Sequence, residues 1–222
     1  MPVAAAVYPV HLVVAGRRVL VVGGGRVAAR KVAGLLPCGA DVTVVAPELG
    51  PELATLHQAD QPDDPDRPGR LQVARRPYER GEAASYELVF TATPDAEVNQ
   101  AVYDDATAAG VWVNSADDPD RCSFVLPSVV RRGPITVTVS TGGHSPAMSV
   151  FLRRWVSDEL GPEYEVLVTL LSEQRAALQA AGRATEGLDW QSALDSDMLD
   201  LVRAGQLDRV RERLKACLTS SS

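Results

Sequence analysis

Small residues form the pattern G-x-G-x-x-A between a short apolar run and a helix-compatible segment. The pattern extends from Gly23 through Gly25 to Ala28, directly after the apolar residues Val19 to Val22. A dinucleotide site needs these residue types. The first glycine permits a tight turn, the second admits a pyrophosphate, and the small third residue keeps the helix close to the sheet. Amide hydrogens at the helix start would then face the phosphates. The alternative is a glycine-rich turn in an α/β protein that binds no phosphate.

Two adjacent acids, Asp117 and Asp118, come after the apolar run Val111 to Asn114. A carboxylate at the carboxyl end of a strand, beside a cofactor, is placed to exchange protons with a bound substrate. Asp117 is therefore a candidate catalytic base. The alternative is an ordinary turn at Asp118-Pro119-Asp120 that Asp117 caps.

A second glycine loop reads S-T-G-G-H-S-P over residues 140–146. Its final Ser-Pro pair favours a helix start, and the glycines allow backbone amides to hold an anion. The alternative is a plain connection from a strand to a helix. His144 is a candidate proton carrier or metal contact, although a lone histidine in a glycine loop is more often solvated. Neither His11 nor His57 has a partner at a metal-binding spacing, so the sequence predicts no metal cluster.

Apolar runs alternate with helix-compatible segments before residue 115, and this alternation predicts a parallel, doubly wound sheet. The predicted strands cover residues 19–22, 42–45, 71–74, 88–93 and 111–114, with a further strand at 8–14 beside the strand of the glycine loop. Thr91, Ala92 and Thr93 are small residues at a carboxyl strand end, where open α/β sheets bind ligands. They leave room there for a cofactor.

The end of the second predicted strand bears on the choice between NAD and NADP. Many NAD-binding folds place an acid at this strand end to hold the ribose hydroxyls. Here Glu48 is displaced beyond Pro47, and no arginine is present for a 2′-phosphate. NAD is favoured, but the sequence leaves the choice open.

The alternation stops after the fifth predicted strand. Strands predicted at 123–130 and 135–140 form a hairpin-like pair, and the remainder is predicted to be helical, mainly over 145–160, 163–181 and 197–218.

Bulk properties narrow the class of protein. The 222 residues are 45% hydrophobic and carry a net charge of −7, which argues against nucleic acid or an anionic membrane as a partner. No run reaches the roughly 18 apolar residues of a membrane span. The three cysteines are far apart and form no C-x-x-C motif, a pattern that fits a reducing, cytoplasmic location.

As an ordered set, these motifs resemble those of the precorrin-2 dehydrogenase and sirohydrochlorin ferrochelatase family of siroheme synthesis. The set comprises G-G-G-x-V-A-x-R-K, V-x-A-P-E, T-A-T-x-D with V-N-Q, V-N-x-x-D-x-P-x-x-C-S-F-x-x-P-S and S-T-G-G-x-S-P. The resemblance implies NAD-dependent oxidation of precorrin-2 to sirohydrochlorin by a homodimer, with Fe2+ insertion as a further activity found in the family. Larger relatives add a methyltransferase domain, for which this chain has no room.

The resemblance also assigns residues. The family's catalytic aspartate falls on Asp117, and its cofactor contacts fall on Arg26, Val27, Pro47 and Glu48. The full predicted cofactor site comprises Gly23, Gly24, Gly25, Arg26, Val27, Ala28, Pro47, Glu48, Thr91, Ala92 and Thr93. The predicted substrate site comprises Asn114, Thr141, Gly142, Gly143 and His144. Thr141 stands where some members have a serine, so a role for that serine does not transfer directly.

The expected fold class is α/β: a Rossmann-like parallel sheet domain, a small β dimerisation region and a C-terminal helical domain. We expect an NAD-binding domain over residues 1–115, a β dimerisation and substrate region over 116–145, and a helical domain over 146–222. Two other functions stay open at this point: a different NAD-linked oxidoreductase on the same fold, or a non-catalytic NAD-sensing domain.

Overall fold

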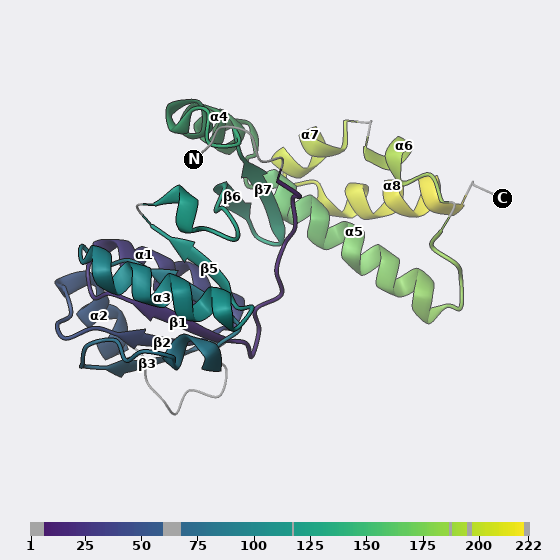
Figure 1. Cartoon of the computed structure of the whole chain (residues 1–222). Helices are drawn as coiled ribbons and strands as arrows, with labels where there is room; N and C mark the ends of the chain where they lie inside the picture. Colours follow the sequence, from purple (N-terminus) through teal and green to yellow (C-terminus); the bar gives the residue numbers. More distant parts are fainter. Residues whose placement is uncertain (1–6, 60–67, 117, 187, 195–196, 220–222) are drawn as a thin grey trace. The chain divides into compact units, whose positions relative to one another are not determined.

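The computed structural model describes residues 7–59, 68–116, 118–186, 188–194 and 197–219 (Figure 1). The chain divides into two compact units, Met1–Leu126 and Pro127–Ser222. In the described ranges, no helix is both long and apolar enough to cross a membrane.

The first unit is built on a five-stranded parallel sheet, which confirms the predicted fold class. Its strands are β1 (Arg18–Val22), β2 (Asp41–Val45), β3 (Arg70–Ala74), β4 (Leu88–Thr91) and β5 (Trp112–Ser115), and their spatial order is β3-β2-β1-β4-β5. Three helices accompany them: α1 (Arg26–Leu35), α2 (Pro51–Ala59) and α3 (Ala96–Ala108). The chain builds outward from β1 to β3 and then returns to β4 on the other side of β1. This reversal is the switch point at which such sheets bind ligands.

Strands β1 and β4 of the sheet are buried on both faces, which explains their nearly continuous apolar sequence. Val19 and Val21 of β1 pack with Val32 of α1 on one face. Leu20 of β1 packs with Val102 of α3 on the other face. Because successive strand residues point to opposite faces, a single strand supplies both layers of the core.

The prediction of a strand at residues 8–14 is wrong. This segment has no regular secondary structure, and the side chains of Tyr8 and Val13 are 88% and 84% exposed. The reason lies in the sheet: β1 already pairs with β2 on one side and with β4 on the other. No edge of β1 is left for another strand.

The second unit joins a hairpin to a helical region. Its elements are β6 (Ser128–Arg132), β7 (Ile135–Val139), α4 (Pro146–Glu159), α5 (Glu163–Ala180), α6 (Trp190–Leu194), α7 (Met198–Arg203) and α8 (Leu207–Thr219). The two strands are antiparallel, as predicted. The predicted helix at 197–218 is interrupted at Gly205, whose φ of 69° ends α7. The predicted strand at 123–130 is shorter, since Ser123 instead donates its backbone N–H to Val113 of β5 (2.8 Å).

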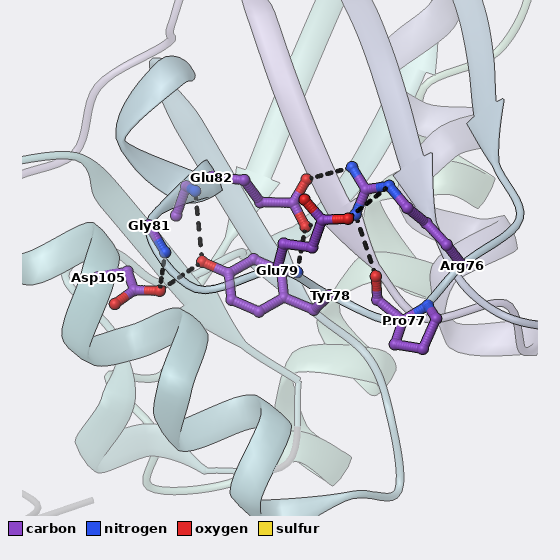
Figure 2. Close-up of polar contacts among 8 residues, drawn as sticks. Arg76, Pro77, Tyr78, Glu79, Gly81, Glu82 and Asp105 are labelled. Atoms are coloured by element: carbon purple, nitrogen blue, oxygen red, sulfur yellow. Dashed lines mark hydrogen bonds and ion pairs between the residues drawn. The ribbon is translucent and has the colours of Figure 1, made fainter.

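The crossover from β3 to β4 contains only a short 3-10 helix, η2 (Glu82–Ser85), and a polar network holds it in place (Figure 2). The Arg76 guanidinium donates to both carboxylate oxygens of Glu82, at 3.0 and 2.7 Å. The same carboxylate accepts the backbone N–H of Glu79 at 2.7 Å. Burial alone would raise the pKa of Glu82, but these hydrogen bonds outweigh it and hold the pKa below its usual value.

A second part of this network ties the crossover to α3 (Figure 2). The Tyr78 hydroxyl donates to Asp105 of α3 at 2.8 Å, and the Gly81 backbone N–H donates to the same oxygen at 2.7 Å. Burial of the hydroxyl, reinforced by this hydrogen bond, raises the pKa of Tyr78 well above its usual value. These hydrogen bonds therefore help to fix the crossover, in addition to the apolar packing of the buried Ala83.

Replacing Glu82 with glutamine should lower the free energy of unfolding at pH 7 by about 2 kcal/mol, the scale of a charge-assisted hydrogen bond. Because the folded-state pKa of Glu82 is lowered, its contribution is present above the unfolded-state pKa and is lost as the pH falls through the folded-state value. Urea unfolding at pH 7 and at about pH 3 should therefore show a smaller deficit at the lower pH. The exposed Glu79→Gln variant is the control and should change little. A deficit of equal size at both pH values would contradict this account.

Candidate functional site

Two positions of the glycine loop between β1 and α1 are closed by neighbouring backbone. Gly23 has a φ of 126°, and a Cβ there would lie 2.3 Å from the carbonyl oxygen of Ala92. A Cβ on Gly24 would lie 1.9 Å from the carbonyl oxygen of Glu48. Both contacts are far below van der Waals separation, so neither position has room for a side chain. The loop is thus pressed against the segments that follow β4 and β2.

Gly25 differs from its neighbours because the space before it is open. A Cβ on Gly25 would meet no atom of the described residues within 4 Å, and its φ of −84° is accessible to any residue. Gly25 is the N-cap of α1, and no side chain caps this helix end. The first N–H groups of a helix have no partner within the helix. The open space and the uncapped N–H groups together suit a phosphate group.

We call the open space before Gly25 and the start of α1 the cradle. The segment after β4 closes one side of it. The fully buried hydroxyl of Thr91 donates to the Ser115 hydroxyl at 3.0 Å, so this side chain braces β4 against β5. Ala92 donates its N–H to Val22 at 2.8 Å and brings its carbonyl to Gly23. The Thr93 hydroxyl accepts the backbone N–H of Asp95 at the start of α3. At this edge of the site, Thr91 therefore joins two strands, Ala92 lies against the glycine loop, and Thr93 binds the start of α3.

The segment after β2 closes the other side. Both Pro47 and Glu48 are exposed, and the Glu48 carbonyl lies against Gly24. Gly50 donates its N–H to the Gly24 carbonyl at 2.8 Å. The structure thus brings residues 23–25, 47–48 and 91–93 together at the carboxyl edge of the sheet. In the first turn of α1, Arg26 is exposed, Val27 is half-buried and Ala28 is buried.

Asn114 is buried and its amide is fully engaged within the protein. Its oxygen accepts from the Lys31 ammonium of α1 at 3.2 Å, and its nitrogen donates to the Phe124 carbonyl at 3.0 Å. The Lys31 ammonium also lies 5.3 Å from the centre of the Phe90 ring, a favourable cation–π distance. Asn114 therefore links α1 to the segment after β5. The sequence motif contains Lys31 but does not indicate this contact, which joins residues 83 positions apart.

Cys122 completes this junction. Its side chain donates to the Ser115 carbonyl at 3.3 Å, and burial raises the pKa of the thiol. The thiol therefore stays protonated at neutral pH and serves as a hydrogen-bonding group.

Asp117 lies outside the described residues, so its catalytic role stays a prediction. The predicted turn beside it is present as the 3-10 helix η3 (Pro119–Arg121). The side chain that caps this turn belongs to Asp118, which accepts the Asp120 N–H at 3.0 Å.

The predicted substrate loop belongs to the second unit. Its Gly142 and Gly143 have φ angles of 59° and 86°, which make a tight turn before α4. The Thr141 hydroxyl donates to the Ser145 carbonyl at 3.0 Å, while the His144 side chain is exposed. Across the described ranges, no three His, Cys, Asp or Glu side chains are grouped to hold a metal ion.

The strand order and the open glycine at the start of α1 define a dinucleotide-binding protein. Residues 10–128 match the family model described as "Putative NAD(P)-binding". The chain belongs to this family, which confirms the cofactor class predicted from the glycine loop.

Individual similar proteins indicate a narrower class than the family model does. A siroheme synthase of Nitrosococcus oceani is 36% identical over 212 residues, which are 95% of this chain and 43% of the relative. A siroheme synthase of Thioalkalivibrio sulfidiphilus is 35% identical over 213 residues, 95% of this chain and 42% of the relative. The chain thus spans less than half the length of these curated relatives. Among solved structures, "SirC, precorrin-2 dehydrogenase" superimposes with a TM-score of 0.72 at 26% identity, covering 95% of this chain and 98% of that chain.

Proposed function

We propose that this chain is an NAD-dependent dehydrogenase that oxidises precorrin-2 to sirohydrochlorin. The observation that carries the proposal is the similarity to the precorrin-2 dehydrogenase SirC, because it covers 95% of this chain and so includes most of both units. A resemblance in the nucleotide-binding unit alone would fit many oxidoreductases. The relatives named siroheme synthase support the same pathway.

The residues of the cradle take distinct parts in this proposal. Bound NAD+ would accept a hydride from the substrate. Gly25 and the uncapped start of α1 would hold the pyrophosphate, while Gly23 and Gly24 let the loop keep its shape against the neighbouring backbone. The exposed carboxylate of Glu48 after β2 favours NAD over NADP, since it would repel a 2′-phosphate.

The proton and substrate steps rest on residues in other segments. Asp117 takes the proton that dehydrogenation releases. The loop of Thr141, Gly142, Gly143 and His144 contacts the acidic substrate, and Asn114 fixes the end of β5 through its buried amide. Fe2+ insertion, which the resemblance also implies, is favoured by no contact among the described residues. The proposal therefore stops at dehydrogenation.

The test of this proposal compares cofactors and product in one assay. The protein is incubated with precorrin-2 and either NAD+ or NADP+, and sirohydrochlorin is identified by its visible spectrum. The proposal predicts faster product formation with NAD+. Turnover only with a different substrate would favour another NAD-linked oxidoreductase. NAD binding without turnover of precorrin-2 would favour an NAD-sensing domain.

We further propose that the protein is a homodimer, and that an exposed face of α4 joins the predicted β dimerisation region, residues 116–145, in the interface. Met148, Phe151 and Trp155 are spaced for one face of this helix, and their side chains are 48%, 64% and 56% exposed. Large apolar side chains gathered on one exposed helix face are typical of an interaction surface.

Replacing Phe151 with glutamate should therefore dissociate the dimer, because the charge would have to be desolvated at the interface. Sedimentation equilibrium should show a dimer for the wild type and a monomer for the variant. Tyr8→Glu, at an exposed aromatic position in the first unit, is the control and should stay dimeric. A dimeric Phe151→Glu protein would exclude this face.

A further inference from the structure

The first unit has a hollow at the edge of the sheet opposite the glycine loop. Its lining includes Arg18, Asp41 and Arg70, which are the first residues of β1, β2 and β3. The glycine loop lies at the carboxyl end of β1. Because the strands are parallel, these three residues lie at the other edge. The volume is about 290 Å³, just below the roughly 300–1,000 Å³ of small-molecule sites.

The hollow exists because the crossover between β3 and β4 is short. Ala83 of η2 belongs to the buried cluster that covers Leu20 of β1 on this face of the sheet. In the same row of the sheet, Thr43 of β2 and Gln72 of β3 line the hollow instead, and Tyr86 borders it after η2. Polar residues stand here on a face that is apolar elsewhere.

Charge alternates across the hollow. The strand register pairs Arg18 with Asp41 and Asp41 with Arg70, so the three side chains form one row across three strands. The nearby Glu87 carboxylate pairs with the guanidinium of Arg17, at 2.7 Å, and not with that of Arg18. In the described part of the chain, no hydrogen bond or ion pair uses the guanidinium group of Arg18 or Arg70. Two cations therefore flank one carboxylate, and all three line the same hollow.

We propose that this hollow binds an acidic amino acid, a small molecule with an ammonium group between two carboxylates. Its charge order is the complement of the row. Each guanidinium would bind one carboxylate by charge-assisted hydrogen bonds, and Asp41 would accept from the ammonium. Neighbouring strands lie about 4.8 Å apart, so Arg18 and Arg70 start about 10 Å apart at the backbone and can both reach a ligand between them.

Calorimetric titration of L-glutamate into the whole chain tests this site, with NAD+ present at saturation so that the glycine loop is occupied. We expect saturable binding, weakened at least about tenfold by Arg70→Gln and by Arg18→Gln, the effect of losing one charge-assisted contact. Arg75→Gln removes a charge from an exposed arginine just after β3 that does not line the hollow. It should leave the affinity unchanged.

Succinate, which has two carboxylates and no ammonium, tests the part of Asp41. It should bind the wild type more weakly than L-glutamate does, and Asp41→Asn should remove this preference. Thermal melting checks that each variant is folded. Absence of saturable binding, equal losses in the Arg70 and Arg75 variants, or equal affinity of the wild type for succinate and glutamate would each overturn the proposal.

Discussion

Replacing Gly25 with threonine should weaken NAD+ binding by about 100-fold, or ~2.7 kcal/mol, and should leave the fold intact. The branched side chain would fill the space in which the pyrophosphate is expected, and no described atom stands in its way. The backbone at Gly25 is extended, and threonine is about as good an N-cap as glycine. The dissociation constant for NAD+ and the melting temperature, measured on the same preparation, separate the two effects.

The neighbouring glycine provides the matched contrast. Gly24→Ala places a Cβ 1.9 Å from the Glu48 carbonyl oxygen, so the segment after β2 must move. We expect a loss of about 3 kcal/mol in the free energy of unfolding, at the upper end for overpacking. Normal NAD+ affinity in Gly25→Thr, or wild-type stability in Gly24→Ala, would contradict the assignment of one open and one closed position.

Asp117→Ala should lower kcat for precorrin-2 oxidation by about 100- to 10,000-fold, the range for loss of a general base. The dissociation constant for NAD+ should not change, since the cradle is formed by other segments. Asp118→Asn is the matched control at the adjacent position. Its side chain caps η3 and pairs with Arg121 at 3.3 Å, so this variant should lose stability and keep most of its activity. Full activity in Asp117→Ala would remove this residue from catalysis and leave the family membership unchanged.

The parallel sheet and the cofactor class could be predicted because both depend on local patterns. Buried parallel strands are short apolar runs, and a phosphate cradle needs small residues at fixed spacing. The strand expected at 8–14 failed for a non-local reason. Its own composition fits a strand, but both sides of β1 are occupied by β2 and β4.

The candidate site, like the fold, could be predicted only where it depends on local patterns. The motif assigned the close approach of a ligand to Gly25, and the open space there agrees with it. Gly24 was also placed in the cofactor site, but the motif does not explain why a glycine is needed there: a Cβ at Gly24 would meet the Glu48 carbonyl, 24 positions along the chain. Likewise, the sequence predicts that Asn114 contacts substrate but does not indicate that its amide joins Lys31 and Phe124. Contacts between distant segments decide these roles, and spacing within one segment does not encode them.

The formation of NADH from NAD+ and precorrin-2, followed by its near-ultraviolet absorbance against a protein-free control, tests the central claim most directly. The account predicts one NADH for each sirohydrochlorin formed by the wild type, and little of either product with Gly25→Thr or Asp117→Ala. Wild-type protein that binds NAD+ but forms no NADH above the control would contradict it.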